Sequence, residues 1–396
     1  MSARHFKVVV VGGGTAGLTA AALLRNRPDA PEVAIVEPSE KHWYQPIWTL
    51  VGGGVLPREE SQREEADYIP PGATWIKDRV ATFQPQHNQI TLQGGEVLTY
   101  DVLVVALGIQ LDWGKVEGLK ETLNKNDVCS NYSYDTVSYT WECLQRFKGG
   151  KAVFTYPLGL IKCAGAPQKI MWLAEHHFER TGIRHKSEVI YNSATAGIFG
   201  VERYARPLRK LLEERKVQTN FKHELFKIDG PAKKAWFRHI ETGAVLEQPF
   251  DMIHVTPPQS SPDVIKQSPL ADAQGWVEVD QYTTQHTRFP NVFSLGDCSS
   301  MPNSKTAAAV RKQAPVLVGN LISYLHGQPL TQHYDGYASC PLVTGYGRLI
   351  MAEFTYGGVP KETLPVEQDR ERYSTWATKT YALPRLYWHG MLRGRW

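Results

Sequence analysis

Hydrophobic and polar residues follow one another along the chain in runs that favour strands and helices in turn. Near the N-terminus, four apolar residues from Val8 predict a short buried strand, and the run LTAAALLRN predicts the helix after it. A second apolar strand, VAIVE, comes next. Residues 74–108 then alternate apolar and polar positions around a Gly94-Gly95 turn, which predicts an antiparallel element returning to the buried strand DVLVVALG. Strand, helix and strand in this order indicate an α/β fold.

A second run of the same elements begins near Lys151. KAVFTYP predicts a strand, PQKIMWLAEHHFERTG a helix, SEVIYNSAT a strand, and RYARPLRKLLEERKV an amphipathic helix with a charged outer face. The runs DMIHVTPP and PNVFSLGDCSS predict two further strands, with which the chain returns to the first unit. A long helix is expected from Thr306, with Ser304 as its N-cap. We therefore expect two Rossmann-like domains, with the second inserted in the first.

These elements divide the 396 residues into four segments, a length that suits two or three domains. We expect the first dinucleotide-binding domain at 1–110, the second Rossmann-like domain at 111–255 and the return of the first domain at 256–330. The last segment, 331–396, interleaves tyrosine and tryptophan with arginine and lysine as far as Trp396. This mixture favours a membrane interface, and the alternative is the interface of a homo-oligomer.

Composition and charge exclude several classes of protein. A net charge of +4, evenly spread, does not predict nucleic-acid binding, and no apolar run reaches the roughly 18 residues of a spanning helix. The start MSARHFK predicts neither a signal nor a transit peptide. Five cysteines without C-x-x-C or zinc spacing predict neither a structural metal nor a disulfide framework.

A glycine motif follows the first strand. Gly12, Gly14 and Gly17 have the spacing G-x-G-x-x-G, in which the first permits the turn, the second admits a pyrophosphate and the third lets helix and strand pack closely. Glu37 ends the second strand, where an acidic residue can bind ribose hydroxyls. Gly108 ends a later strand where the backbone must pass a ligand closely. The pattern predicts a dinucleotide site, and the alternative is a glycine-rich turn in another βαβ unit.

The second strand–helix unit lacks such a motif. The run PLGLIKCAGAPQK has glycines at the wrong spacing and places Cys163 in the turn, so a pyridine nucleotide is not expected there. Cys163 precedes a helix N-terminus and has Lys162 and Lys169 close in sequence, which favours its thiolate. Cys340 is expected in a fixed turn, because Pro341 follows it in a run that contains glycine. Cys143 and Cys298 are expected to be structural core residues.

These residues resemble the sulfide:quinone oxidoreductase family, in the subgroup that includes the mitochondrial enzyme. The resemblance is carried by VVVVGGGTAG, EPSEKHWYQPIWTLVGGG, KCAGAPQKIMWLAE, HVTPPQSSPDVIKQSPLAD, FSLGDCSSMPNSKTAAAV and YASCPLVTGYGRLIMAEF. It implies a flavoprotein with two dinucleotide domains and FAD in the first. The family's FAD positions fall on Thr15, Ala16, Glu37, Gln45, Val80, Asp297 and Lys305. The helix expected from Thr306 would point its positive end at the flavin.

The resemblance also implies a mechanism in which Cys163 and Cys340 form the redox-active pair. Sulfide attacks at Cys340 and leaves a persulfide, Cys163 is released as a thiolate, and two electrons pass through FAD to a membrane quinone. Sulfite, glutathione or another thiol, or cyanide then removes the sulfur. We expect a peripheral protein on the cytoplasmic face of a bacterial inner membrane.

Four residues carry weaker expectations. Cys129 lies in a polar loop where mitochondrial relatives have glycine, and in another branch of the family a cysteine near this place bonds the flavin covalently, so covalent FAD is one hypothesis. For the quinone pocket we name Phe354, Tyr387 and Trp388.

Three other functions compete with this interpretation. A type-II NADH:quinone oxidoreductase shares the architecture, but the missing second glycine motif argues against it. A cytochrome acceptor is disfavoured by the aromatic C-terminal segment. A non-catalytic flavoprotein redox sensor would bind FAD without sulfide turnover.

Overall fold

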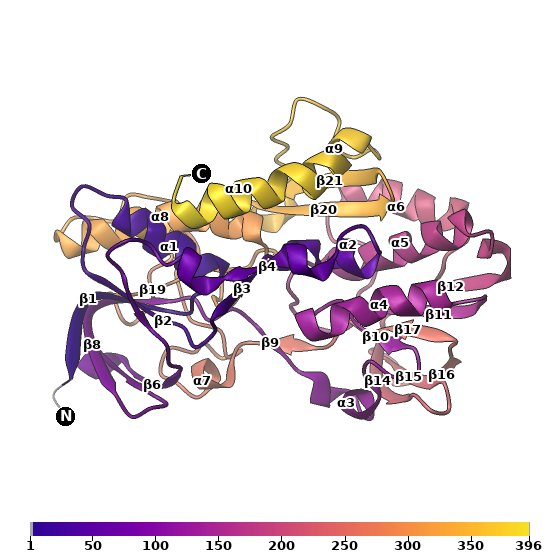
Figure 1. The fold of residues 1–396 in the computed structure, drawn as a ribbon, viewed down its shortest axis with the longest axis horizontal. Helices are drawn as coiled ribbons and strands as arrows, with labels where there is room; N and C mark the ends of the chain where they lie inside the picture. Colours follow the sequence, from indigo (N-terminus) through magenta and orange to yellow (C-terminus); the bar gives the residue numbers. More distant parts are fainter. Residues whose placement is uncertain (1–2, 396) are drawn as a thin grey trace.

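The computed structural model describes residues 3–395, so Trp396 lies outside the described residues. Two α/β units lie next to each other, and the C-terminal segment runs along the upper edge of both (Figure 1). The hairpin of β20 (Ala338–Gly345) and β21 (Arg348–Phe354) lies over the second unit, and α10 (Leu383–His389) lies over the first. This arrangement confirms the predicted fold class.

The first unit is built on a seven-stranded sheet with the order β5-β2-β1-β8-β7-β6, in which β19 also pairs with β8. The strands β1, β2, β5, β8 and β19 pair in parallel, whereas β6 and β7 form the predicted antiparallel element. Val8 to Val11 have no exposed surface, as expected of a central parallel strand covered on both faces. The strands are β1 (Arg4–Val11), β2 (Val33–Val36), β5 (Thr74–Ile76), β6 (Val80–Gln84), β7 (Gln89–Leu92), β8 (Val97–Val105) and β19 (Val292–Ser294).

The second unit has a five-stranded parallel sheet with the order β10-β17-β11-β12-β13. An antiparallel sheet of three strands, β14-β15-β16, lies beside it. The strands are β10 (Val128–Cys129), β11 (Gly150–Tyr156), β12 (Ser187–Ser193), β13 (Gln218–Phe221), β14 (His223–Asp229), β15 (Lys234–His239), β16 (Val245–Pro249) and β17 (Met252–His254).

Short strand pairs complete the sheets. They are β9 (Gln110–Leu111) with β18 (Gln259–Ser260), where the chain leaves and re-enters the first unit, and β3 (Lys41–Trp43) with β4 (Gln62–Glu64). The chain therefore leaves the first sheet after Val105 and rejoins it at Val292. The domain boundaries given above stay a prediction.

The helices cover the sheets and bring the two units together. Helix α1 packs against α8, α2 packs against α4 and α5, and α5 packs against β20. The helices are α1 (Thr15–Arg25), α2 (Trp48–Gly52), α3 (Leu119–Thr122), α4 (Tyr134–Arg146), α5 (Ala166–Arg180), α6 (Glu202–Glu214), α7 (Asp263–Lys266), α8 (Ala307–Leu325) and α9 (Tyr373–Ala377). A π-helical turn, Thr378–Ala382, joins α9 to α10, and a 3₁₀ turn, Met391–Arg393, follows.

Two local expectations were wrong. Helix α8 is capped by Thr306, whose side chain accepts from Ala309 N at 3.1 Å, and not by Ser304. Cys340 lies inside strand β20 and not in a turn. A two-stranded hairpin leaves one edge of each strand unpaired, so Pro341, which has no N–H, is tolerated within the strand.

The close approach of α1 and β1 yields a test of the fold. A Cβ at Gly17 would lie 1.8 Å from the carbonyl oxygen of Gly12, and backbone cannot yield as a side chain does. We expect Gly17→Ala to lower the free energy of unfolding by about 1–3 kcal/mol, measured by urea denaturation followed by circular dichroism. Gly197→Ala is the control, since a Cβ there meets no atom within 4 Å, and its effect should stay within about 0.5 kcal/mol. Equal effects of both substitutions would contradict the packing argument.

Candidate functional site

The glycine turn between β1 and α1 is shaped to receive a phosphate group. Gly12 has φ +103, and a Cβ there would lie 2.5 Å from the carbonyl oxygen of Ala106, so only glycine fits. At Gly14 a Cβ would meet no atom within 4 Å, which leaves the backbone before α1 open. The free N–H groups and positive end of α1 favour an anion at this place. The turn therefore fits the pyrophosphate of a dinucleotide.

Glu37 lies against the same turn. Its carboxylate accepts hydrogen bonds from Gly13 N at 2.7 Å and Ser39 N at 2.8 Å. These bonds hold the side chain at the carboxyl end of β2, in the position predicted for an acidic residue that binds ribose. The buried Glu65 Oε1 lies close to Gly13 and has no hydrogen-bond partner among the described residues, so an acceptor is free at the turn. This local arrangement fits the adenosine end of FAD.

A second group of predicted cofactor residues lies where the first unit meets the second. Gly296 packs against Ala16 of the glycine turn, which places the neighbouring Asp297 beside it. Burial raises the pKa of Asp297, and Lys305 and Lys162 oppose that shift, so a carboxyl and two ammonium groups share this region. These groups could hold the ribityl and ring parts of a flavin.

The predicted cofactor residues also include Gln45, Val80 and Gly108. Gln45 accepts from Lys162 Nζ at 2.7 Å, which ties the loop before α2 to the loop before α5. Val80 is buried at the start of β6, and Gly108 has φ +73 with no atom within 4 Å of a Cβ.

Cys163 occupies a special backbone position ahead of α5. Its φ of +52 is in the left-handed region, which is costly for a residue with a Cβ and is often found at functional sites. The conformation is held by its N–H, which donates to Lys305 O at 2.9 Å, and by its carbonyl, which accepts from Ala166 N at 2.7 Å. The segment before α8 therefore holds the backbone of Cys163, which lies in the turn where a phosphate-binding loop would stand.

The structure brings Cys163 and Cys340 together, although one lies in the second unit and the other in the C-terminal segment. Both are free thiols, and a hydrogen bond from Cys340 is the largest cause that holds the pKa of Cys163 well below its usual value. Burial opposes this shift, and the ammonium of Lys169, with Nζ 3.0 Å from Cys163 Sγ, supports it. The same hydrogen bond raises the pKa of Cys340 well above its usual value. Cys163 is therefore the thiolate and Cys340 the thiol.

Cys340 is the more enclosed of the two cysteines. It has no exposed surface, and its Sγ lies 3.6 Å from Ser304 Oγ. Cys163 is only partly buried. Ser304, predicted as a helix cap, thus lies at the cysteine pair instead.

Lys379 completes the site and was missed by sequence reasoning. It lies on the π-helical turn, is 2% exposed, and donates from Nζ to Pro46 O at 2.9 Å. Its pKa is lowered to about 7, first by burial and then by the neighbouring Lys169, while both cysteines oppose the shift. Burial likewise lowers the pKa of Lys162 to about 8. No pattern in the sequence marks a lysine on a π-helical turn, so only the fold could reveal it.

The remaining cysteines lie in the core. Cys129 has no exposed surface, donates to Ile253 O at 3.5 Å and interacts with Cys143, and burial raises its pKa well above the usual value. This environment favours a core role for Cys129 over a covalent bond to flavin. Cys298 is also fully buried, with its thiol directed at Val105 O.

The three residues named for the quinone pocket do not form one cluster. Tyr387 and Trp388 pack in the core of the first unit, whereas Phe354 packs in that of the second, against Phe199. Tyr387 and Trp388 are 2% and 4% exposed, so neither faces outward. The structure therefore gives no support to a shared pocket of these three side chains.

Residues 6–137 match the family described as pyridine nucleotide-disulphide oxidoreductase. The mitochondrial sulfide:quinone oxidoreductase of Dictyostelium discoideum is 49% identical over 98% of this chain and 86% of its own, and that of Mus musculus is 48% identical over 99% and 87%. The crystal structure of the sulfide:quinone oxidoreductase from Aquifex aeolicus is similar in fold, with a TM-score of 0.83, 20% identity, and coverage of 99% of this chain and 92% of that one.

The electrostatics of Cys163 can be tested by alkylation of the reduced protein with iodoacetamide, since only the thiolate reacts. We expect Lys169→Met to move the pH profile of Cys163 alkylation to higher pH, because loss of the neighbouring ammonium raises the pKa of this thiol. Lys379→Met should have a smaller effect that fades above about pH 8, where the lysine has lost its charge in the parent protein. Lys210→Met, at an exposed lysine of α6, is the control, and an equal effect of this variant would contradict the assignment.

Proposed function

Because the chain belongs to the sulfide:quinone oxidoreductase family, we propose that it oxidises sulfide at Cys163 and Cys340 and passes two electrons through FAD to a membrane quinone. The observation that carries this proposal is the buried cysteine pair, polarised by a hydrogen bond and by lysines, at the place where a second phosphate loop would stand. FAD, the cofactor of this class of enzyme, supplies a two-electron acceptor at this pair when it is bound.

The reaction begins from a disulfide between Cys163 and Cys340. Hydrosulfide attacks the sulfur of Cys340, a new S–S bond forms there, and the bond to Cys163 breaks. Cys340 then carries a persulfide, and Cys163 leaves as a thiolate with the electron pair of the broken bond. The opposite pKa shifts of the two cysteines support this direction, since the sulfur with the lower pKa is the better leaving group.

The second half restores the disulfide. A nucleophile such as sulfite, a thiol or cyanide attacks the outer sulfur of the persulfide and takes it away, and Cys340 is released as a thiolate. The two thiolates then rejoin, and this oxidation releases two electrons. The net change converts hydrosulfide to transferable sulfane sulfur, and quinone takes up the two electrons with two protons.

Lysine side chains stabilise the negative charge that appears in each half of this cycle. Lys169 contacts Cys163 directly, and Lys379 lies close enough to both cysteines that each of them raises its pKa. With a pKa of about 7, Lys379 can hold a proton when a thiolate forms and release it near neutral pH. We assign it the role of charge stabiliser and proton donor to Cys340.

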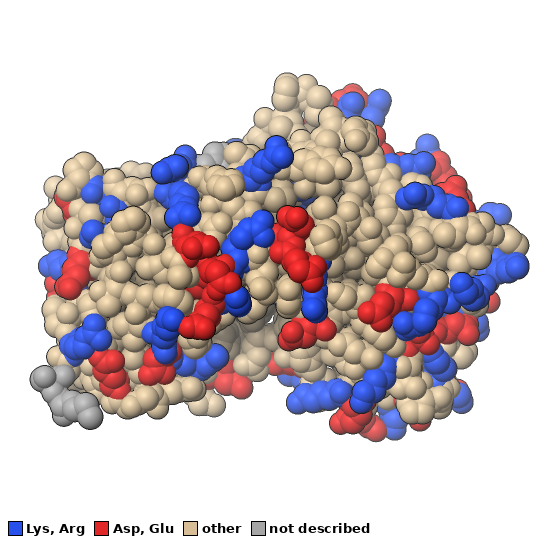
Figure 2. Space-filling view, in the orientation of Figure 1, with Lys and Arg blue, Asp and Glu red and all other residues tan. Residues whose placement is uncertain are grey.

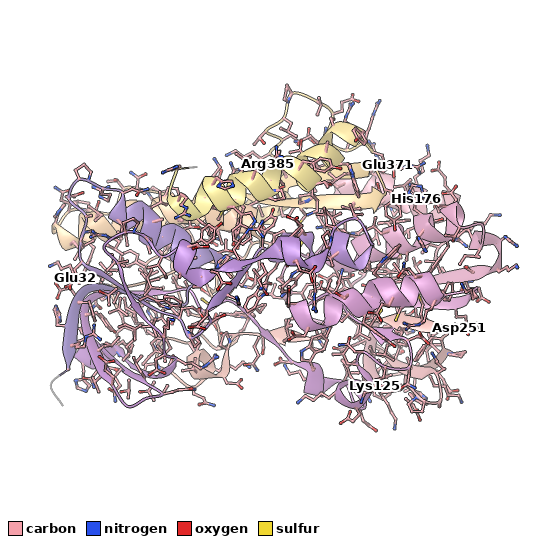
Figure 3. The ribbon with its side chains drawn as sticks, in the orientation of Figure 1. Glu32, Lys125, His176, Asp251, Glu371 and Arg385 are labelled. Atoms are coloured by element: carbon pink, nitrogen blue, oxygen red, sulfur yellow. The ribbon has the colours of Figure 1, made fainter. Side chains whose placement is uncertain are left out.

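The C-terminal segment is our candidate for the membrane surface. Tyr373, Tyr381 and Leu386 are 68%, 56% and 38% exposed, and Arg385 lies on the outer side of α10 (Figure 3). In Figure 2 the edge of the molecule over this segment carries few charged side chains, most of them basic. Exposed aromatic and basic groups together suit a bilayer interface. The quinone would enter from this side.

No helix within the described residues has the length and apolarity needed to cross a bilayer. Peripheral attachment is thus our proposal, while the two relatives compared above are mitochondrial by name. The bacterial inner membrane named above stays a prediction.

The main competing function is NADH oxidation. After β11 the chain has no second glycine motif, and Lys162 and Cys163 occupy that turn. A redox sensor would also use a low-pKa thiolate, so the lowered pKa of Cys163 suits both functions. Sulfide turnover separates them, because a sensor binds FAD without oxidising sulfide.

Removal of either redox cysteine tests the proposal. We expect Cys163→Ser and Cys340→Ser each to lower sulfide:quinone turnover at least about 100-fold while the protein keeps its FAD, because neither variant can form the disulfide. Turnover is measured with a short-chain quinone, and FAD content from the flavin absorbance. Cys143→Ala is the control, since that thiol is buried in α4, and it should retain turnover. Near-normal activity of either serine variant would refute the mechanism.

A further inference from the structure

A buried chain of hydrogen bonds joins α10 to the glycine turn of the first unit. Glu65 Oε2 lies 3.0 Å from His42 Nδ1, and His42 Nε2 lies 2.6 Å from the hydroxyl of Tyr387. That hydroxyl lies 2.7 Å from Thr15 Oγ1. Glu65, His42 and Tyr387 are 1%, 3% and 2% exposed. We call these four side chains the Thr15 relay.

The relay ends at a place that the fold prepares for an anion. Thr15 is the first residue of α1 and directly follows Gly14, where the backbone is open. A hydroxyl at a helix N-terminus can donate to a phosphate oxygen beside the free N–H groups. The side chain of Thr15 can do so only if its proton is not already donated to another group.

The hydrogen positions along the relay decide whether that proton is free. With the ring proton on Nε2, His42 donates to Tyr387, and the Tyr387 hydroxyl then donates to Thr15. The Thr15 proton remains for a ligand. In the opposite arrangement Tyr387 donates to His42, Thr15 donates to Tyr387, and Thr15 offers a phosphate only lone pairs. Burial raises the pKa of Glu65, and the hydrogen bond with His42 opposes this shift. A protonated Glu65 donates to His42 Nδ1 and leaves the ring proton on Nε2, which favours the first arrangement.

The surroundings of His42 contain further charges and aromatic rings. Arg63 is its partner across the β3–β4 pair, and Arg393 lies 4.7 Å from the ring of Tyr68. The rings of Tyr68 and Trp388 lie 6.2 and 5.6 Å from the imidazole. Glu65 is the acidic side chain in direct contact with His42.

The same C-terminal segment also holds the other end of α1. Asn26, the C-cap of α1, donates through Nδ2 to Arg393 O at 2.7 Å and Gly394 O at 3.3 Å. Between these contacts, Tyr387, Trp388, Met391 and Leu392 belong to the core of the first unit. The segment 383–395 is therefore fastened to both ends of the helix whose N-terminus faces the dinucleotide.

We propose that the Thr15 relay is part of the FAD site: Tyr387 of α10 orients the Thr15 hydroxyl proton toward the pyrophosphate, so that FAD retention depends on the C-terminal segment. Tyr387 and His42 are positioning residues, since they act through Thr15. The assignment rests on the proposed function only for the identity of the dinucleotide. It gives Tyr387 a role in cofactor binding in place of the one expected for it in a quinone pocket.

The test measures the dissociation constant of FAD from the purified holoprotein, without sulfide or quinone. Tyr387→Phe removes the hydroxyl and keeps the ring, and we expect the constant to rise about tenfold, as for loss of one hydrogen bond to a charged group. Tyr68→Phe is the matched control, because its ring packs 5.1 Å from that of Trp388 but its hydroxyl is outside the relay, and it should change the constant less than about twofold. Circular dichroism of each variant reports the unfolding midpoint separately.

Variants at Thr15 show whether Tyr387 acts through this hydroxyl. Thr15→Ser keeps the hydroxyl and should retain FAD, and its affinity should still fall when Tyr387→Phe is added. Thr15→Val removes the hydroxyl and should weaken FAD binding, and the addition of Tyr387→Phe should then change nothing. If Tyr387→Phe does not fold, His42→Gln serves as the variant that interrupts the relay.

An unchanged FAD dissociation constant in Tyr387→Phe, or full additivity with Thr15→Val, would overturn the assignment, even if the unfolding midpoint fell. Because no substrate is present, the outcome is independent of the turnover test. A protein that loses FAD in Tyr387→Phe but never oxidises sulfide would support the relay and contradict the proposed function.

Discussion

The hydrogen bond between Cys340 and Cys163 is the interaction on which the rest of the site depends. One thiol precedes α5 of the second unit and the other lies on a hairpin of the C-terminal segment, so the bond exists only when both are docked correctly. Helix α5 packs against β20, and the segment before α8 fixes the left-handed conformation of Cys163. The insertion of one domain in the other, the hairpin and the long helix α8 all serve to hold two sulfur atoms at one point.

That pair is placed in a partly buried cationic environment, which is costly to build. Burial of an ammonium group disfavours its charge, and the lowered pKa values of Lys162 and Lys379 show this cost directly. A thiolate at Cys163 offsets part of it, because the negative sulfur compensates the lysine charges. The free-energy cost of burying the lysines is therefore smallest when Cys163 is a thiolate. This is the state that the reaction produces. The C-terminal segment contributes Lys379 to this environment and Tyr387 to the glycine turn.

Much of the fold could be predicted from the sequence, since glycine spacing and apolar periodicity report local geometry. The turn at Gly12, the antiparallel element and the contact of Lys169 with Cys163 depend on neighbours in sequence. The largest influence on the Cys163 thiolate, the hydrogen bond from Cys340, comes from a distant segment. The predicted turn at Cys340 failed because a proline and a glycine are also compatible with an edge strand. Lys379 and the contacts of Tyr387 depend on how the C-terminal segment folds back over both units, which no local pattern records. An aromatic residue in a basic segment can face a bilayer or a core, and Tyr387 and Trp388 face the core.

The central claim is that electrons enter from sulfide through the cysteine pair, and an anaerobic titration of the oxidised holoprotein tests it most directly. Sodium sulfide is added in steps, with sulfite present to take the sulfur from the persulfide, while the flavin absorbance is recorded. NADH is added to a parallel sample, and a third sample receives sulfite alone. We expect sulfide to bleach the flavin at about one equivalent per cysteine pair, and NADH or sulfite alone to leave it oxidised. Bleaching by NADH, with no response to sulfide, would contradict the central claim.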